Sequence, residues 1–77
     1  MNNPQILALL QNGLRNLENG NLPAADAKLR EAIKIDKRHP HAAYLLGLTN
    51  WKMGNRQEAI SLVKKAATLN PLSLIHI

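Results

Sequence analysis

The stretch Gly47-Leu48-Thr49-Asn50-Trp51-Lys52-Met53-Gly54-Asn55 repeats the pattern of residues 13–21, which read Gly13-Leu14-Arg15-Asn16-Leu17-Glu18-Asn19-Gly20-Asn21. Glycine, leucine, asparagine and a closing Gly-Asn pair stand 34 positions apart in the two segments. The alignment extends outward without a gap, through the pairs Ala8/Ala42, Ala25/Ala59 and Ala32/Ala66. Because small side chains and turn glycines recur in phase, the sequence predicts two copies of one structural unit.

Local signals divide each unit into two helices. Pro4 and Pro40 suit a first helical turn, where the missing N–H of proline has no intrahelical partner. Gly20 and Gly54 are expected to end the first helix of each unit, since glycine accepts the left-handed cap conformation. Asn70-Pro71 is expected to end the last helix. We therefore predict helices near residues 4–18, 23–36, 40–53 and 56–69.

Small residues at helical spacing indicate how these helices pack. Gly47 and Ala59, like their equivalents in the first unit, let two antiparallel helices approach closely, and Ala32 lets the following helix approach. A single hairpin cannot bury both of its apolar faces, so neighbouring hairpins must stack. The predicted fold is all-α, an α-solenoid of two stacked antiparallel helical hairpins.

The second unit resembles a tetratricopeptide repeat in its Leu46-Gly47 pair, its alanines at 59 and 66 and its final Pro71. The first unit keeps the glycine and both alanines, but it has Asn12 where the family prefers leucine and Lys37 where it prefers proline. The resemblance implies a lead-in at residues 1–5, a first repeat at 6–39 and a second at 40–71.

Residues 72–77, with the sequence Leu-Ser-Leu-Ile-His-Ile, depart from this pattern. The codons CTG-TCT-CTT-ATA-CAC-ATC, a transposon end used to tag sequencing libraries, encode the same hexapeptide. We expect a non-native read-through tail here, on an N-terminal fragment of a longer protein. A genuine apolar strand or helix start is the alternative.

Composition excludes several classes of protein. The chain has 77 residues and no cysteine, which rules out disulfide frameworks and Cys-based zinc sites. His39 and His41 lack a third ligand nearby, and no phosphate-binding loop or catalytic constellation is present. No stretch approaches the ~20 apolar residues of a membrane span. We expect a cytoplasmic protein that is not an enzyme and binds no cofactor, metal or membrane.

The family resemblance implies a concave face formed by the first helix of each repeat. Trp51 and Tyr44, the only aromatic residues, lie on that face, and such residues dominate binding hot spots. Packing between repeats is the alternative role for every apolar member. The predicted partner-binding groove consists of Leu10, Leu14, Leu17, His41, Tyr44, Leu48, Trp51 and Lys52.

The resemblance thus implies a module that binds a protein or peptide. The run Leu45-Leu46-Gly47-Leu48 is also similar to repeats that precede glycosyltransferase or sulfotransferase domains in bacterial proteins, which offers an alternative with catalysis outside this chain. The net charge of +5 is spread along the chain, and two aromatics offer little base stacking, so nucleic-acid binding is not expected. Ile60, Val63 and Ala67 on the last helix are expected to be partly uncovered, which predicts marginal stability or self-association there.

Overall fold

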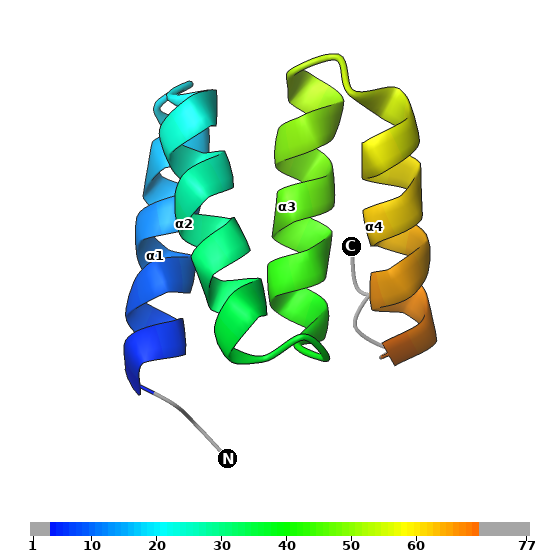
Figure 1. The fold of residues 1–77 in the computed structure, drawn as a ribbon. Helices are drawn as coiled ribbons and strands as arrows, with labels where there is room; N and C mark the ends of the chain where they lie inside the picture. Colours follow the sequence, from blue (N-terminus) through cyan, green and yellow to red (C-terminus); the bar gives the residue numbers. More distant parts are fainter. Residues whose placement is uncertain (1–3, 70–77) are drawn as a thin grey trace.

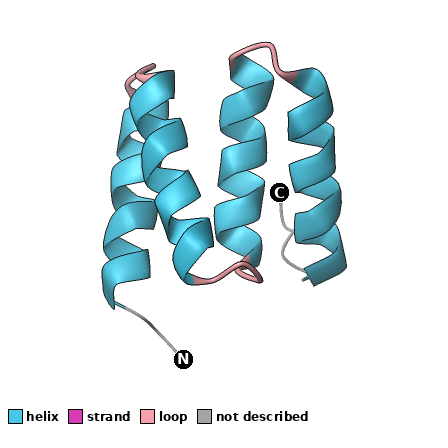
Figure 2. Ribbon diagram, viewed as in Figure 1, coloured by secondary structure: helices cyan, strands magenta, loops and turns pink. Residues whose placement is uncertain are grey.

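The computed structural model describes residues 4–69, which form four α-helices and no strand (Figure 2). They are α1 (Pro4–Glu18), α2 (Leu22–Ile35), α3 (Pro40–Lys52) and α4 (Arg56–Leu69). Helices α1 and α2 make one antiparallel hairpin, and α3 and α4 make a second beside it (Figure 1). Helix α3 packs on α2 and touches α1, whereas α4 packs mainly on α3. The predicted all-α fold of two stacked hairpins is confirmed.

The helix bounds agree with the sequence prediction to within one residue. Helix α2 begins at Leu22, after Asn21, because Pro23 fits the first turn. It ends at Ile35, since Asp36 already has extended backbone geometry. Helix α3 ends at Lys52 and is followed by Met53 and Gly54. The predicted tail at residues 72–77, the final Pro71 and the first residues of the lead-in lie outside the described part of the chain.

The two hairpin turns share one hydrogen-bonded geometry. Gly20 and Gly54 have φ angles of +80° and +90°, in the left-handed region that favours glycine. In the second turn, the Gly54 N–H donates to the Trp51 carbonyl at 3.1 Å and the Asn55 N–H donates to the Asn50 carbonyl at 2.9 Å. The first turn has the same pair of bonds. This pattern satisfies carbonyls in the last turns of α1 and α3, and three residues connect the helices of each hairpin.

The helices of each hairpin meet at a glycine. A Cβ placed on Gly13 would lie 2.7 Å from Cγ of Leu29, and one placed on Gly47 would lie 2.9 Å from Cγ2 of Val63. Both separations are too short for carbon atoms in contact. The absence of a side chain at these positions therefore sets the distance between α1 and α2 and between α3 and α4.

An apolar cluster joins the first hairpin to the second. Its buried members are Ile6 of α1, Ala32 of α2 and Ala42 of α3. The half-buried residues packed against it are Leu9, Leu10 and Ile33. Ala32 and Ala42 are fully buried, so their small side chains let α2 and α3 approach closely. This apolar contact holds the two hairpins together and thereby determines which faces of α3 and α4 are exposed to solvent.

Candidate functional site

One stripe of α3 faces an apolar hollow. Tyr44, Leu48 and Trp51 are spaced by four and three residues, so their side chains share a face of the helix. They meet residues of α4 across the hairpin, because Gly47 brings α4 close to α3. The hollow has a volume of about 390 Å³ and is lined by Tyr44, Gly47, Leu48, Trp51, Ala59, Ile60, Val63 and Lys64. We call this surface the α3–α4 hollow.

Trp51 dominates the rim of the α3–α4 hollow. Its side chain is 52% exposed, although it is the largest in the chain. The guanidinium carbon of Arg56, at the start of α4, lies 5.5 Å from the centre of the Trp51 ring, which is a cation–π contact. Lys52, the next residue along α3, is exposed. The rim therefore combines a large aromatic surface with positive charge.

His41 lies near the start of α3, exposed, with its ring centroid 6.3 Å from that of His39 in an edge-on arrangement. The neighbouring His39 has a structural role: its Nδ1 accepts a hydrogen bond of 3.3 Å from the Ala42 N–H. This bond satisfies one of the free amides of the first turn of α3. His39 therefore caps the helix, whereas the side chain of His41 is exposed to solvent.

The predicted groove residues of α1 are divided among different environments. Leu10 is half-buried and packs against the apolar cluster between the hairpins, and Leu17 is only 7% exposed. Leu14 is 41% exposed. The structure thus places Tyr44, Leu48 and Trp51 together in the α3–α4 hollow, while Leu10 and Leu17 pack within the fold.

Half of the α3–α4 hollow comes from α4, which the predicted groove did not include. Ile60, Val63 and Lys64 contribute side chains, and Ala59 lies beneath them. Ile60 is 47% exposed although it is a large apolar residue. Sequence reasoning identified Ile60 and Val63 as an uncovered face, but it did not join that face to the stripe of α3. The spacing of residues along α3 predicts which side chains share a face, whereas only the packing of the hairpin shows that Ile60 and Val63 of α4 lie beside them.

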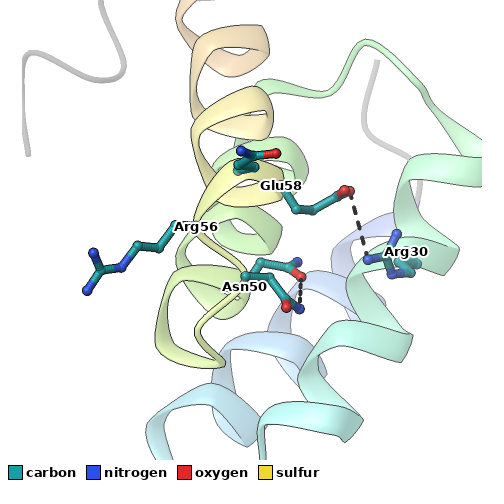
Figure 3. A pocket seen from close by; sticks show the side chains of 6 residues that line it. Arg30, Asn50, Arg56 and Glu58 are labelled. Atoms are coloured by element: carbon teal, nitrogen blue, oxygen red, sulfur yellow. Dashed lines mark hydrogen bonds and ion pairs between the residues drawn. The ribbon is translucent and has the colours of Figure 1, made fainter.

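A second, polar hollow of about 410 Å³ lies where the two hairpins meet at the α3–α4 turn (Figure 3). Asn50 is fully buried there, and its side-chain amide donates to Asp26 Oδ1 of α2 at 3.2 Å and to the Leu46 carbonyl at 2.9 Å. Asn55 donates to Asn50 Oδ1 at 3.2 Å. Asn50 therefore links α2, α3 and the turn.

Charged groups extend this link at the surface. Arg30 Nε donates to Asp26 Oδ2 at 2.9 Å, and Arg30 Nη2 lies 4.0 Å from Glu58 Oε2 of α4. The hydrogen bond to Asp26 is the main cause that raises the pKa of Arg30 above its usual value. In Figure 3, Glu58 reaches toward Arg30, whereas Arg56 points away from the polar hollow. The polar hollow is thus a junction between hairpins whose groups already bind one another.

Residues 4–69 contain neither a cluster of metal-ligating side chains nor a helix that could cross a membrane. No group of three or more His, Asp or Glu side chains in this range is arranged to hold a metal ion. None of the four helices has the length and apolar character needed to cross a bilayer.

Comparison with protein families identifies the second hairpin. Residues 40–71, which include both helices of the second hairpin, match the family model described as Tetratricopeptide repeat. No curated protein matches the chain. Four helices in two hairpins are consistent with tandem repeats of this kind, and the recognition made from sequence is confirmed. Such repeats are general protein–protein interaction modules and are typically non-catalytic.

Proposed function

We propose that the chain is a protein-interaction module that binds a peptide or partner surface on α1 and α3, because residues 40–71 match the tetratricopeptide repeat family model. The observation that carries the proposal is the convergence of Tyr44, Leu48 and Trp51 on one apolar hollow beside an exposed aromatic ring. No residue is assigned a catalytic or cofactor-binding role.

The surface chemistry of α1 and α3 supports this proposal. Large apolar side chains are exposed on both helices, with Leu7 and Leu14 on α1 and Trp51 on α3. Contiguous exposed apolar surface is costly in water, and it commonly marks a site of protein association. Aromatic anchors of this kind contribute a large share of binding energy when a partner covers them. The exposed Lys52 and His41 add polar groups that can orient a partner.

The single tryptophan of the chain gives a direct assay, because Trp51 is itself a groove residue. Peptides would be selected from a random phage-display library against the chain and titrated while Trp51 fluorescence is recorded. A peptide that covers the ring should shift its emission to the blue. Leu14→Asp tests the groove, and Ile35→Asp is the matched control, because the two side chains are 41% and 40% exposed and only Leu14 lies in the groove.

We expect Leu14→Asp to weaken binding of the selected peptides by about tenfold or more, since loss of an apolar contact of hot-spot size has that effect. Ile35→Asp should leave affinity within about twofold, as expected for a side chain remote from the interface. The proposal fails if selected peptides bind without changing Trp51 emission. It also fails if the control variant weakens binding as much as Leu14→Asp does.

A further inference from the structure

The 34-residue repeat shows which surface of the second hairpin is left open. Helix α3 packs on α1 and α2, and its Asn50 bonds Asp26. The 34-residue period makes Trp51, Ile60 and Val63 of the second hairpin the equivalents of Leu17, Asp26 and Leu29 of the first. Leu17 is 7% exposed whereas Trp51 is 52% exposed, and Leu29 is fully buried whereas Val63 is half-buried. We call the surface of α1 and α2 on which α3 lies the first seat. The α3–α4 hollow is its equivalent in the second hairpin and is called the second seat.

We propose that the α3–α4 hollow docks an amphipathic α-helix of a partner protein, with an apolar stripe facing Ile60 and Trp51 and acidic residues along its flanks. The helix would lie on α3 and α4 as α3 itself lies on α1 and α2. This proposal rests on the interaction function proposed above and goes beyond it, because it moves the docking surface to α3 and α4 and names the conformation and the chemistry of the partner.

The shape of the seat specifies a helix. The residues of α3 that are buried against its neighbours are mainly small or apolar and follow helical spacing: Ala42, Ala43, Leu46, Thr49 and Asn50. Gly47 and Ala59 line the α3–α4 hollow. Gly13 and Ala25 stand at the equivalent positions of the first hairpin. A surface that repeats the first seat in its small residues is suited to a helix packed at the same close distance.

One substitution between the repeats changes what the docked helix must carry. In the first seat, the carboxylate of Asp26 accepts a hydrogen bond from Asn50 of α3. In the second seat, Ile60 stands at the position of Asp26. An amide placed against Ile60 would lose its partner on burial, which is unfavourable. The partner helix is therefore expected to have an apolar residue where α3 has Asn50.

The charges around the α3–α4 hollow favour an acidic partner. Lys64 lines it, Arg56 stacks on Trp51, and Lys52, the next residue along α3, is exposed. Glu58 is the only carboxylate on α3 or α4, and it faces Arg30 of the first hairpin. Acidic residues along the flanks of a docked helix would lie near these positive charges. Such complementarity raises the rate of association and fixes the alignment of the bound helix.

The same features oppose a second copy of this chain as the occupant. Two α3–α4 hollows brought face to face would bring their cations together. Docking α1 of another copy would place Asn12 and Arg15 where α3 has the buried residues Leu46 and Thr49. Burial of an unpaired arginine is strongly unfavourable. The self-association expected from the sequence is therefore the competing outcome in the test.

The test uses synthetic peptides with the sequence of residues 40–53, which are titrated against the full chain. The first peptide carries Asn50→Leu and has glutamate at positions 41, 44, 48 and 51. It therefore contains no tryptophan, and Trp51 of the protein reports binding. The second peptide has the same glutamates but keeps Asn50, and the third carries Asn50→Leu with lysine in place of the four glutamates.

We expect the N50L peptide to bind about tenfold more tightly than the peptide that keeps Asn50, because an unpaired buried amide is costly. The lysine peptide should bind about tenfold more weakly at low salt, and this difference should shrink as ionic strength rises. Ile60→Asp in the protein should weaken binding about tenfold or more, whereas the control Ile35→Asp, at an isoleucine of similar exposure, should not. Circular dichroism would check that both variants keep their helices.

The proposal is overturned if no peptide changes Trp51 emission, if the peptide that keeps Asn50 binds as well as the N50L peptide, or if Ile60→Asp has no effect on binding. Sedimentation that shows a dimer sensitive to Ile60→Asp would also overturn it, in favour of a second copy. The interaction function would survive these outcomes if library-selected peptides still bound in a manner that depends on Leu14. The interaction function itself would fail if Leu14→Asp left the binding of these selected peptides unchanged.

Discussion

Gly47→Ala tests whether close helix contact determines the second hairpin. The added Cβ would lie 2.9 Å from Cγ2 of Val63 and 3.2 Å from the carbonyl oxygen of Ala59. Neither neighbour yields easily, because valine has one preferred rotamer in a helix and the carbonyl belongs to the backbone of α4. Overpacking of this kind costs about 1–3 kcal/mol, and two neighbours that yield little place this substitution in the upper part of that range, at about 2–3 kcal/mol.

The gain in helix propensity from glycine to alanine offsets about 1 kcal/mol of that cost. We therefore expect Gly47→Ala to lower the free energy of unfolding by about 1–2 kcal/mol, a decrease in Tm of roughly 4–16 °C for a domain of this size. Urea and thermal unfolding followed by far-UV circular dichroism would measure both quantities.

Val63→Ala supplies the second arm of a double-mutant cycle, because it removes the methyl group nearest to the new Cβ. Alone, it should destabilise the chain through the lost packing of a half-buried valine. Combined with Gly47→Ala, it should cost less than the sum of the two single changes by about 1 kcal/mol. The explanation is refuted if Gly47→Ala is as stable as the parent, or if the two changes are additive.

Three further predictions concern the turns and the junction between the hairpins. Gly20→Ala should lower the free energy of unfolding by about 1 kcal/mol, because the φ angle of Gly20 is +80°, although no atom lies near the new Cβ. An unchanged midpoint of urea unfolding would contradict this reasoning. Asn50→Ala should cost about 2 kcal/mol by the same assay, since it removes the buried amide that bonds Asp26, and a loss below about 0.5 kcal/mol would indicate that the junction is dispensable. Arg30→Ala should cost less than about 1 kcal/mol, since its partners Asp26 and Glu58 are partly exposed, and melts in low and high salt should show that difference disappear.

Much of the fold could be predicted because its signals are local. The positive φ angles at Gly20 and Gly54, the cap at His39 and the pair Asp26–Arg30 each depend on residues within one or two helical turns. The pairing of helices followed from the 34-residue period, because repeated small residues require repeated close contacts.

The candidate site was harder to predict, because neighbours across a hairpin are not neighbours in sequence. The stripe of Tyr44, Leu48 and Trp51 was apparent from helical spacing, but its partners Ile60 and Val63 on α4 emerged only from the packing of the two helices. The opposite happened on α1, where Leu17 has the spacing of a groove residue and is buried by neighbouring helices.

The sequence alone determined the number of helices, their turns and the order in which they pair, because caps, turn glycines and helical spacing act over a few residues. Tertiary structure decided which of two equivalent surfaces is covered. Leu17 and Trp51 occupy the same place in the repeat, yet Leu17 is 7% exposed and Trp51 is 52% exposed. Burial depends on which helix comes next in space, and repeat position does not contain that information.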